Sequence, residues 1–388
     1  MVRSLHVYVH VPFCARKCPY CHFYNLGHDD GREAVFLDGM AREIARRRAG
    51  GAFEAARLAT LYWGGGTPSL LSAAGFERLA ALCLGIAPAG ERFEWTVEMN
   101  PADADAERLA AYRERRVNRL SIGVQSFDPA RLEFLGRNHD GETARRAVLA
   151  AFEAGFENLS VDLMFNLAVP GRRRGWARDL SVAFDLPISH LSLYGLTLES
   201  GTAFHARARA GTRLTIEDSA YAAEYRAACR AARRAGFEHY EVSSFARPGR
   251  RSRHNGAYWS GVSYLGLGPA AHSFDGVRRW ANVASLVRWA DALATGGDPR
   301  AFVESVGPAE REIEALYLGL RTDAGIPAGQ LFGSPGTIDA LVRDGFCRRT
   351  GERLVCTEKG YLLLDSILER LLPPAEGRPV IGRPAAGD

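Results

Sequence analysis

Lysine is nearly missing from this 388-residue sequence, which contains only Lys17 and Lys359 among its 49 basic residues. Arginine supplies all the others, and the abundant alanine and glycine beside it point to coding bias. A strong excess of charge is also missing, because 49 basic and 45 acidic residues leave a formal net charge of only +4. This balance argues against a dedicated nucleic-acid-binding protein, which needs a clearly basic surface.

Long hydrophobic runs are missing as well. No stretch of 18 apolar residues occurs, so no transmembrane helix is predicted and only a peripheral membrane contact stays open. Residues 1–11 alternate with period two, and they lack the continuous apolar stretch and small-residue cleavage site of a signal peptide. We therefore expect a cytoplasmic protein.

The composition is that of an ordinary globular protein. Hydrophobic residues make up 47% of the chain, and 41 Gly and 18 Pro stay below the share that marks low-complexity sequences. At about 150 residues per domain, the length predicts one large α/β unit with smaller additions.

The seven cysteines carry the first chemical signal. An odd number in a cytosolic chain argues against a disulfide framework. Cys14, Cys18 and Cys21 have the spacing C-x3-C-x2-C, which suits an iron–sulfur cluster. Zinc is the alternative, but a closed zinc site needs four ligands and the sequence has no second cysteine pair with ligand spacing; the adjacent His22 is poorly placed to complete one. We expect the other four cysteines to be small core residues.

Six β-type runs alternate with helix-like segments in the first half of the chain. This alternation predicts a parallel sheet with right-handed crossovers, either doubly wound or an incomplete barrel. The predicted strands are 5–10, 58–63, 93–99, 119–123, 158–165 and 190–196, and the predicted helices are 32–48, 72–84, 103–115, 129–135, 142–154 and 175–184.

Polar and glycine-rich segments follow four of these strands, at the end where α/β enzymes place their sites. These segments begin at Cys14, Gly64, Glu98 and Gln125. The sequence therefore predicts one site built along a single rim of the sheet.

The pattern changes after residue 215. We predict a barrel domain over 1–215, an elaborating lobe over 216–305, a C-terminal domain over 306–372 and a disordered tail over 373–388. The order helix, helix, hairpin in the C-terminal domain resembles a winged helix. DNA binding by this unit is not favoured, because residues 338–344 have few of the basic and amide side chains that contact bases.

Residues 10–21, HVPFCARKCPYC, resemble the cysteine motif of the radical S-adenosylmethionine (SAM) superfamily. Within it, the chain looks like the branch that contains oxygen-independent coproporphyrinogen III oxidases and HemW heme chaperones, over about residues 5–372. The supporting segments are YWGGGTPS (62–69), EMNP (98–101), GVQSF (123–127), LGR (135–137), DLMF (162–165) and HNGAYW (254–259). The resemblance implies an incomplete (β/α)6 TIM-type barrel with a C-terminal winged-helix-like domain.

The resemblance also implies cofactors. Cys14, Cys18 and Cys21 would bind three irons of a [4Fe–4S] cluster, and SAM would bind the fourth iron. Glu98 would accept the ribose hydroxyls of SAM, and Arg137 would pair with its carboxylate. Further SAM contacts are expected from Tyr8, Phe23, Gly65, Gly66, Thr67, Gln125 and Asp162. Each of these residues could instead have a purely structural role, for example in a tight turn or as an aromatic residue of the core.

Two features separate the chaperone from the oxidase in this family. The oxidase has a fourth cysteine where this chain has Phe23, and it has a long segment before its cysteines, whereas 13 residues precede Cys14 here. Both features favour a heme chaperone that delivers heme to a respiratory enzyme, with homodimer formation as a further expectation. An oxidase, or another radical SAM enzyme acting on a tetrapyrrole, is the alternative.

Heme is the third cofactor that the resemblance implies. His254 is the candidate heme residue, since imidazole is a common axial ligand, and Arg250, Arg251 and Arg253 could pair with propionates. His22 and Cys229 are weaker candidates for the ligand. The structural alternative is that His254 closes a turn and that the nearby aromatic residues belong to a core.

Overall fold

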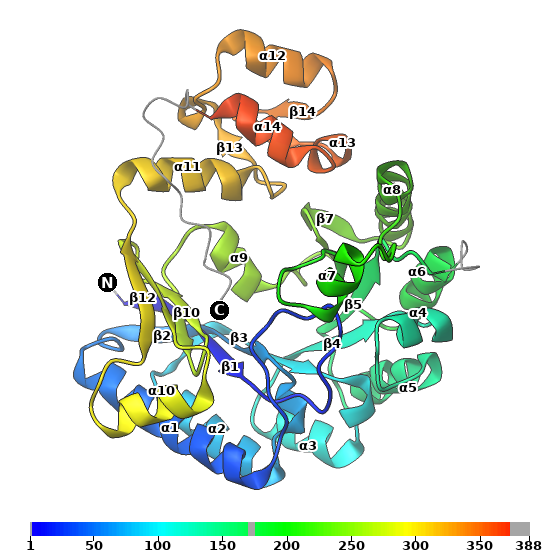
Figure 1. Ribbon diagram of the computed structural model, residues 1–388. Coiled ribbons are helices and arrows are strands. Elements are labelled where there is room, and N and C mark those ends of the chain that lie inside the picture. The colour runs from blue at the N-terminus through cyan, green and yellow to red at the C-terminus, as the bar shows by residue number, and fades with distance from the viewer. Residues whose placement is uncertain (1, 170–174, 373–388) are drawn as a thin grey trace.

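The computed structural model describes residues 2–169 and 175–372 (Figure 1). Its first half consists of six β/α units, as the alternation predicts. The strands are β1 (Arg3–Val11), β2 (Ala56–Gly65), β3 (Ala89–Met99), β4 (Arg119–Gln125), β5 (Leu159–Phe165) and β6 (His190–Gly195). The helices are α1 (Asp30–Ala49), α2 (Ala73–Leu84), α3 (Ala106–Glu114), α4 (Pro129–Phe134), α5 (Gly141–Glu153) and α6 (Gly175–Asp185).

Aspartate caps fix the start of several of these helices. A carboxylate at this position accepts an otherwise unpaired backbone N–H of the first turn. The aspartates that do so are Asp29, Asp105, Asp128 and Asp140.

The six strands form one parallel run in the order β6-β5-β4-β3-β2-β1. The two ends of this run do not meet: β1 pairs on its outer edge with β9 (Leu265–Leu267), and β6 pairs with β8 (Ser244–Ala246). The barrel is therefore open, which confirms the predicted fold class.

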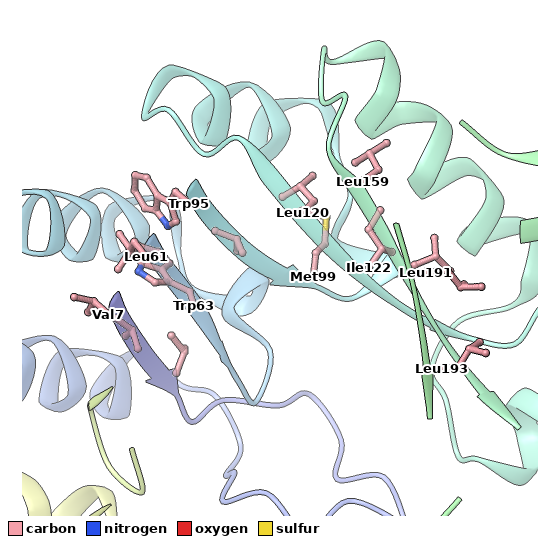
Figure 2. Close-up of a cluster of buried hydrophobic side chains, with 14 of the residues drawn as sticks. Val7, Leu61, Trp63, Trp95, Met99, Leu120, Ile122, Leu159, Leu191 and Leu193 are labelled. Carbon is pink, nitrogen blue, oxygen red and sulfur yellow. The ribbon is translucent and has the colours of Figure 1, made fainter. Parts of the chain in front are cut away.

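The two faces of the sheet differ sharply in polarity. Successive residues of a strand point to opposite faces of the sheet. The side chains on the face covered by the helices are buried and apolar: Val7, Leu61, Trp63, Trp95, Leu120, Ile122, Leu159, Leu191 and Leu193 (Figure 2). The intervening positions carry Tyr8, Tyr62, Glu98, Ser121, Asp162 and Ser192. The interior of the barrel is thus polar, and the apolar core lies between the sheet and its helices.

The main sheet continues beyond residue 215. The strand β8 pairs antiparallel with β6, β7 (Glu238–Glu241) pairs antiparallel with the outer edge of β8, and β9 pairs parallel with β1. The segment predicted as an elaborating lobe therefore contributes three strands to the barrel sheet. Its helices are α8 (Asp218–Arg234), α9 (Arg253–Trp259) and α10 (Leu286–Ala294), and a second sheet contains β10 (His272–Phe274), β11 (Arg278–Asn282) and β12 (Arg300–Ser305). The helix α7 (Ala203–Arg209) precedes this segment and follows β6.

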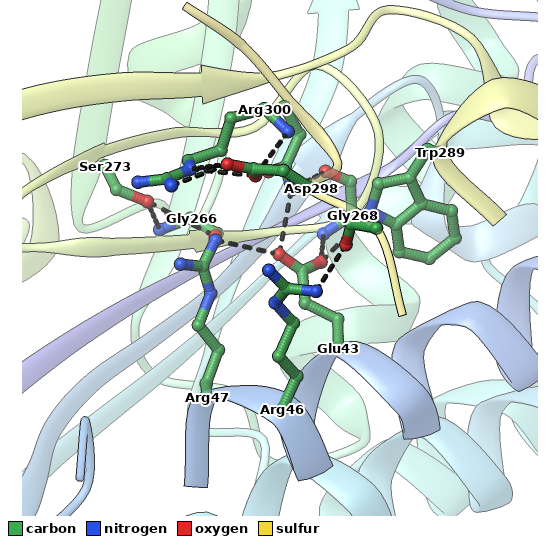
Figure 3. A network of polar contacts seen from close by, with 11 residues as sticks. Glu43, Arg46, Arg47, Gly266, Gly268, Ser273, Trp289, Asp298 and Arg300 are labelled. Carbon is green, nitrogen blue, oxygen red and sulfur yellow. Dashed lines mark hydrogen bonds and ion pairs between the residues drawn. The ribbon is translucent and has the colours of Figure 1, made fainter. Parts of the chain in front are cut away.

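A buried carboxylate holds α1 against this later part of the chain (Figure 3). Glu43 accepts hydrogen bonds from Gly268 N (2.9 Å), Asn282 Nδ2 (2.9 Å) and Trp289 Nε1 (3.2 Å). Arg47, one helical turn further along α1, lies 3.1 Å from the same carboxylate. A buried charge is stable only when it is paired and hydrogen-bonded in this way.

The C-terminal section follows the predicted order of helix, helix and hairpin (Figure 1). It contains α11 (Pro308–Gly319), α12 (Pro335–Arg343), α13 (Glu358–Tyr361) and α14 (Leu364–Leu371), with a sheet in the order β13 (Ile326–Pro327), β15 (Arg353–Cys356), β14 (Cys347–Thr350). The predicted domain boundaries stay predictions, and the tail 373–388 lies outside the described residues.

Short 3-10 turns η1 (Pro68–Leu70), η2 (Pro101–Asp103) and η3 (Ala328–Gln330) complete the described elements. Across residues 2–169 and 175–372, no helix is both long and apolar enough to cross a membrane.

Candidate functional site

The three clustered cysteines lie on one loop that follows β1. The loop is closed at its base, because Cys14 N donates to Leu26 O (2.9 Å) and Leu26 N donates to Pro12 O (2.8 Å). Inside the loop, Cys21 N donates to Cys18 O (3.1 Å). These backbone bonds bring the cysteines together at the end of β1.

The sulfur atom of each of the three cysteines lies near one polar side chain, and these three side chains come from three different segments of the chain. Cys14 Sγ lies 3.5 Å from Thr67 Oγ1, Arg137 Nη1 donates to Cys18 Sγ at 3.5 Å, and Asn25 Nδ2 donates to Cys21 Sγ at 3.8 Å. Donors of this kind stabilise negative charge on sulfur.

Burial raises the pKa of the Cys14 thiol to about 11 and also raises the pKa of Cys21. At neutral pH these thiols therefore keep their protons until a metal displaces them.

The glycine segment that follows β2 packs against this loop. A Cβ on Gly66 would lie 2.5 Å from the carbonyl oxygen of Phe13, and a Cβ on Gly65, whose φ is +103°, would lie 2.5 Å from the His10 ring. Only glycine fits such close approaches. The need for glycine at these two positions therefore comes from the packing of the chain on itself, while both residues also line the cavity described below.

Glu98 ends β3 inside the barrel. Its carboxylate accepts a hydrogen bond from the Tyr62 hydroxyl (2.7 Å). Burial, opposed by that hydrogen bond and reinforced by the nearby negative charge of Asp162, raises the pKa of Glu98 to about 7. A carboxyl group with this pKa changes charge near neutral pH.

Asp162 lies on β5, two strands away from Glu98. The Ser121 hydroxyl donates to its carboxylate at 3.2 Å. Burial, partly offset by a hydrogen bond from Ser192, raises the pKa of Asp162 to about 6. Two carboxyl groups with raised pKa values in one cavity wall are typical of a functional site.

Gln125 and Arg137 complete the polar wall. Gln125 ends β4 with a φ of +64°, a conformation that non-glycine residues seldom adopt. The turn after it is held by the buried Asp179, which accepts from Phe127 N (2.6 Å) and pairs with Arg131 (3.1 Å). Arg137 donates to Gly123 O (2.8 Å), and its buried Nε atom has no hydrogen-bond partner among the described residues.

These side chains surround one cavity of about 380 Å³, within the range of small-molecule sites. Of the residues predicted as first candidates to bind the cluster, SAM or the heme iron, all but two line it, whereas Arg250, Arg251, Arg253 and Cys229, the further candidates for heme contacts, do not. The first candidates that line the cavity are Cys14, Cys18, Cys21, Phe23, Gly65, Gly66, Thr67, Glu98, Gln125, Arg137 and Asp162.

Tyr8 is one of the two exceptions. Its ring is stacked with Tyr62, with centroids 6.1 Å apart, and its hydroxyl lies 3.2 Å from His10 Nδ1. Tyr8 therefore packs against Tyr62, which contacts Glu98. Tyr8 itself is not among the described residues that line the cavity.

His254, the predicted heme residue, also lies elsewhere. It is 1% exposed, and both ring nitrogens are engaged: Nδ1 lies 2.7 Å from Thr60 Oγ1, and Nε2 lies 2.9 Å from the Tyr258 hydroxyl. Its ring also stacks on Tyr62 at 5.0 Å. In this arrangement neither imidazole nitrogen is free for a heme iron, so the alternative of a structural histidine describes its surroundings better.

The sequence reasoning missed several residues that line the cavity or contact its walls. Tyr62, which donates a hydrogen bond to Glu98, could have been found from its alternation with Leu61 and Trp63, whose side chains face the helices. Tyr194, near the end of β6, follows the same alternation with Leu191 and Leu193. Asn25 carried no such signal, because its position depends on how the cysteine loop folds back on itself.

The arrangement fits the two cofactors that the motif implies. Three thiols with separate donors face one cavity, and the unpartnered Nε of Arg137 is available to a bound anionic group. The carboxylates of Glu98 and Asp162 can accept hydrogen bonds from hydroxyl or amino groups.

Comparisons with known proteins show which family the chain belongs to. Residues 8–170 match the family model of the radical SAM superfamily. The chain is 35% identical to heme chaperone HemW from Mycobacterium tuberculosis over 94% of both chains, and 32% identical to heme chaperone HemW from Bacillus subtilis over 94% of this chain and 98% of that one. It is also 36% identical to the mouse protein "Radical S-adenosyl methionine domain-containing protein 1, mitochondrial", over 95% of this chain and 87% of that protein.

The fold has a solved counterpart. Coproporphyrinogen III oxidase (HemN) from Escherichia coli superposes with a TM-score of 0.80 over 95% of this chain and 90% of that chain, at 22% identity. This likeness shows a shared fold. Radical SAM proteins use a [4Fe–4S] cluster and SAM, which are therefore the cofactors implied for this chain. The extent and level of the sequence identity show that the chain belongs to the HemW family of the radical SAM superfamily.

Proposed function

We propose that this protein binds heme and delivers it to a heme-dependent respiratory enzyme. The observation that carries the proposal is its identity of 32–35% to proteins named heme chaperone HemW, over almost the whole length of each chain. A homodimer and a respiratory recipient belong to the same proposal, as does the cytoplasmic location predicted from the sequence.

We assign the residues of the cavity as follows. Cys14, Cys18 and Cys21 bind the cluster, and the donor groups beside their sulfurs stabilise the thiolates. The cluster and SAM, when bound, supply one-electron chemistry. Glu98 orients SAM by accepting its ribose hydroxyls, and Arg137 binds its carboxylate through the guanidinium.

The cluster ligands have a direct test. Replacing any one of the three cysteines with Ala should abolish the broad iron–sulfur absorbance after anaerobic reconstitution. Cys83→Ala is the matched control, because Cys83 is a buried thiol on α2 with no place in the cavity. An unchanged spectrum in all three single variants would contradict the ligand assignment.

Heme binding is tested by an anaerobic titration of the cluster-loaded protein, followed by Soret absorbance. The proposal requires saturable binding, and its absence would contradict the chaperone function. His254→Ala belongs in the same experiment. Because both ring nitrogens of His254 have protein partners, we expect this variant to lose stability. A shifted Soret band at an unchanged melting temperature would instead return His254 to the heme site.

The alternative function is an oxygen-independent coproporphyrinogen III oxidase. Phe23 at the cavity, where the oxidase branch has a cysteine, argues against it. Incubation with coproporphyrinogen III under anaerobic reducing conditions, followed by product analysis, should give no decarboxylated product.

A further inference from the structure

Three side chains of the kinds that bind metals meet outside the cluster cavity. They are Cys229 on α8, His239 on β7 and Glu358 at the start of α13. One ligand atom from each lies within 4.8 Å of the other two. The function proposed above uses none of them.

The His239 ring is held in a defined orientation. It stacks on Phe245 with centroids 4.2 Å apart and an interplanar angle of 18°, and Tyr361 meets it at 5.2 Å in an edge arrangement. One face of the imidazole is thus covered by the Phe245 ring, Tyr361 meets the imidazole at an angle, and both ring nitrogens have polar neighbours. A fixed ring of this kind needs little reorganisation to bind an ion.

The hydrogen bonds around His239 also assign its tautomer. The Tyr225 hydroxyl donates to Val242 O at 2.7 Å, so its oxygen is free to accept from His239 Nε2, which lies 3.3 Å away. With the proton on Nε2, the Nδ1 atom carries a lone pair. That Nδ1 lies 3.9 Å from Cys229 Sγ. This is the arrangement of a metal-binding histidine, in which the second ring nitrogen is held by a neighbouring group.

Glu358 supplies the oxygen. Its side chain is 29% exposed and forms an ion pair with Arg233, whose side chain is 70% exposed. Because the Arg233 side chain extends into solvent, breaking its contact with one carboxylate oxygen of Glu358 costs little free energy and leaves that oxygen free to bind an ion. Surface ion pairs of this kind contribute little to stability.

We propose that Cys229, His239 and Glu358 bind one zinc ion, with water as the fourth ligand. Sulfur, nitrogen and oxygen donors in a four-coordinate shell are those that zinc prefers. In such a shell, bonds of about 2.0–2.3 Å place ligand atoms roughly 3.3–3.8 Å apart, so the present spacing of up to 4.8 Å has to contract by no more than about 1.5 Å. On binding, the Zn–S bond forms as the Cys229 thiol releases its proton to solvent, and no electron is transferred.

The ion would connect two parts of the chain. Cys229 and His239 belong to the elements that extend the barrel sheet, whereas Glu358 belongs to the C-terminal section. Zinc would therefore fasten the C-terminal section to the barrel and raise the melting temperature of the protein.

The test uses the full chain with its cluster loaded, so that the three cluster cysteines are occupied. After dialysis against zinc, we expect about one zinc per chain in the parent protein and in Cys83→Ala, and a loss of that zinc in Cys229→Ala. Cobalt in place of zinc should add a thiolate-to-cobalt absorption band to the cluster spectrum in the parent and in Cys83→Ala. Cys229→Ala should lack this band.

Glu358→Gln provides a second variant that spares the core. Its zinc affinity should fall at least about tenfold, as loss of one ligand requires, and zinc should raise its melting temperature by less than it raises that of the parent. The proposal is overturned if Cys229→Ala and Glu358→Gln keep the zinc content and affinity of the parent. It is also overturned if cobalt binds without a thiolate band.

Discussion

The raised pKa of Glu98 leads to a quantitative prediction for SAM binding. If the ionised carboxylate accepts the ribose hydroxyls, SAM binds the deprotonated form of Glu98, and its apparent Kd contains the factor 1 + 10^(pKa − pH). The pKa of Glu98 is raised to about 7, so the group is ionised above this pH and becomes protonated below it. The factor is about 11 at pH 6 and about 1.1 at pH 8, which predicts about tenfold weaker binding at pH 6.

The assay is equilibrium dialysis of labelled SAM with the cluster-loaded protein between pH 6 and pH 8. Glu98→Gln should bind SAM at least about tenfold more weakly at pH 8, because it loses charge-assisted hydrogen bonds of about 1.5–3 kcal/mol. It should also lose the part of the pH dependence that comes from this residue, whereas ionisation of SAM itself affects both proteins equally.

Two further variants sharpen the test. Asp162→Asn removes a negative charge that raises the pKa of Glu98, so the midpoint of the pH profile should move down. Glu107→Gln, an exposed glutamate in the first turn of α3, should behave as the parent does. The reasoning is refuted if the pH profiles of the parent and Glu98→Gln coincide.

Three other changes have predicted outcomes. Glu43→Gln should lower the free energy of unfolding in urea by about 2–4 kcal/mol, because the nitrogen of a buried amide cannot accept the hydrogen bonds that the carboxylate accepts. As a control, Asp38→Asn at an exposed position of the same helix should change the free energy of unfolding by less than about 0.5 kcal/mol. Asp179→Asn should lower it by about 3–5 kcal/mol, measured in the same way, because Arg131 is left buried without its counter-charge. Phe23→Cys should not create coproporphyrinogen decarboxylation in an anaerobic product assay, since one added thiol leaves the other residues that line the cavity unchanged; product from this variant would show that one cysteine is sufficient.

The six β/α units were predictable because each strand is long enough to show its pattern. Strands such as Leu159–Phe165 are bounded by helices with their own caps, so local propensity and the fold agree. The strands β8 and β9 contain three residues each, which is too few for a periodic signal. Their place in the main sheet depends on contacts between residues far apart in the chain, such as Tyr8 with Gly266.

The candidate site shows the same division. Residues directly after strands, such as Glu98 and Gln125, were predictable because parallel strands end at one rim. The surroundings of His254 were not predictable, because the sequence shows an imidazole among aromatic residues but not its partners. Thr60 and Tyr258 engage its two nitrogens, and Thr60 is distant in sequence and reaches His254 only after α9 packs on β2.

The position of β1 bears on how the protein acquires its cluster. This strand is hydrogen-bonded to β2 on one edge and to β9 on the other, and the cysteine loop begins directly after it. Its amide protons should therefore exchange with solvent only during rare, large openings of the sheet. Because the cysteines lie on the loop and not on the strand, we expect that iron and sulfide can be loaded onto a finished scaffold without unfolding of the barrel.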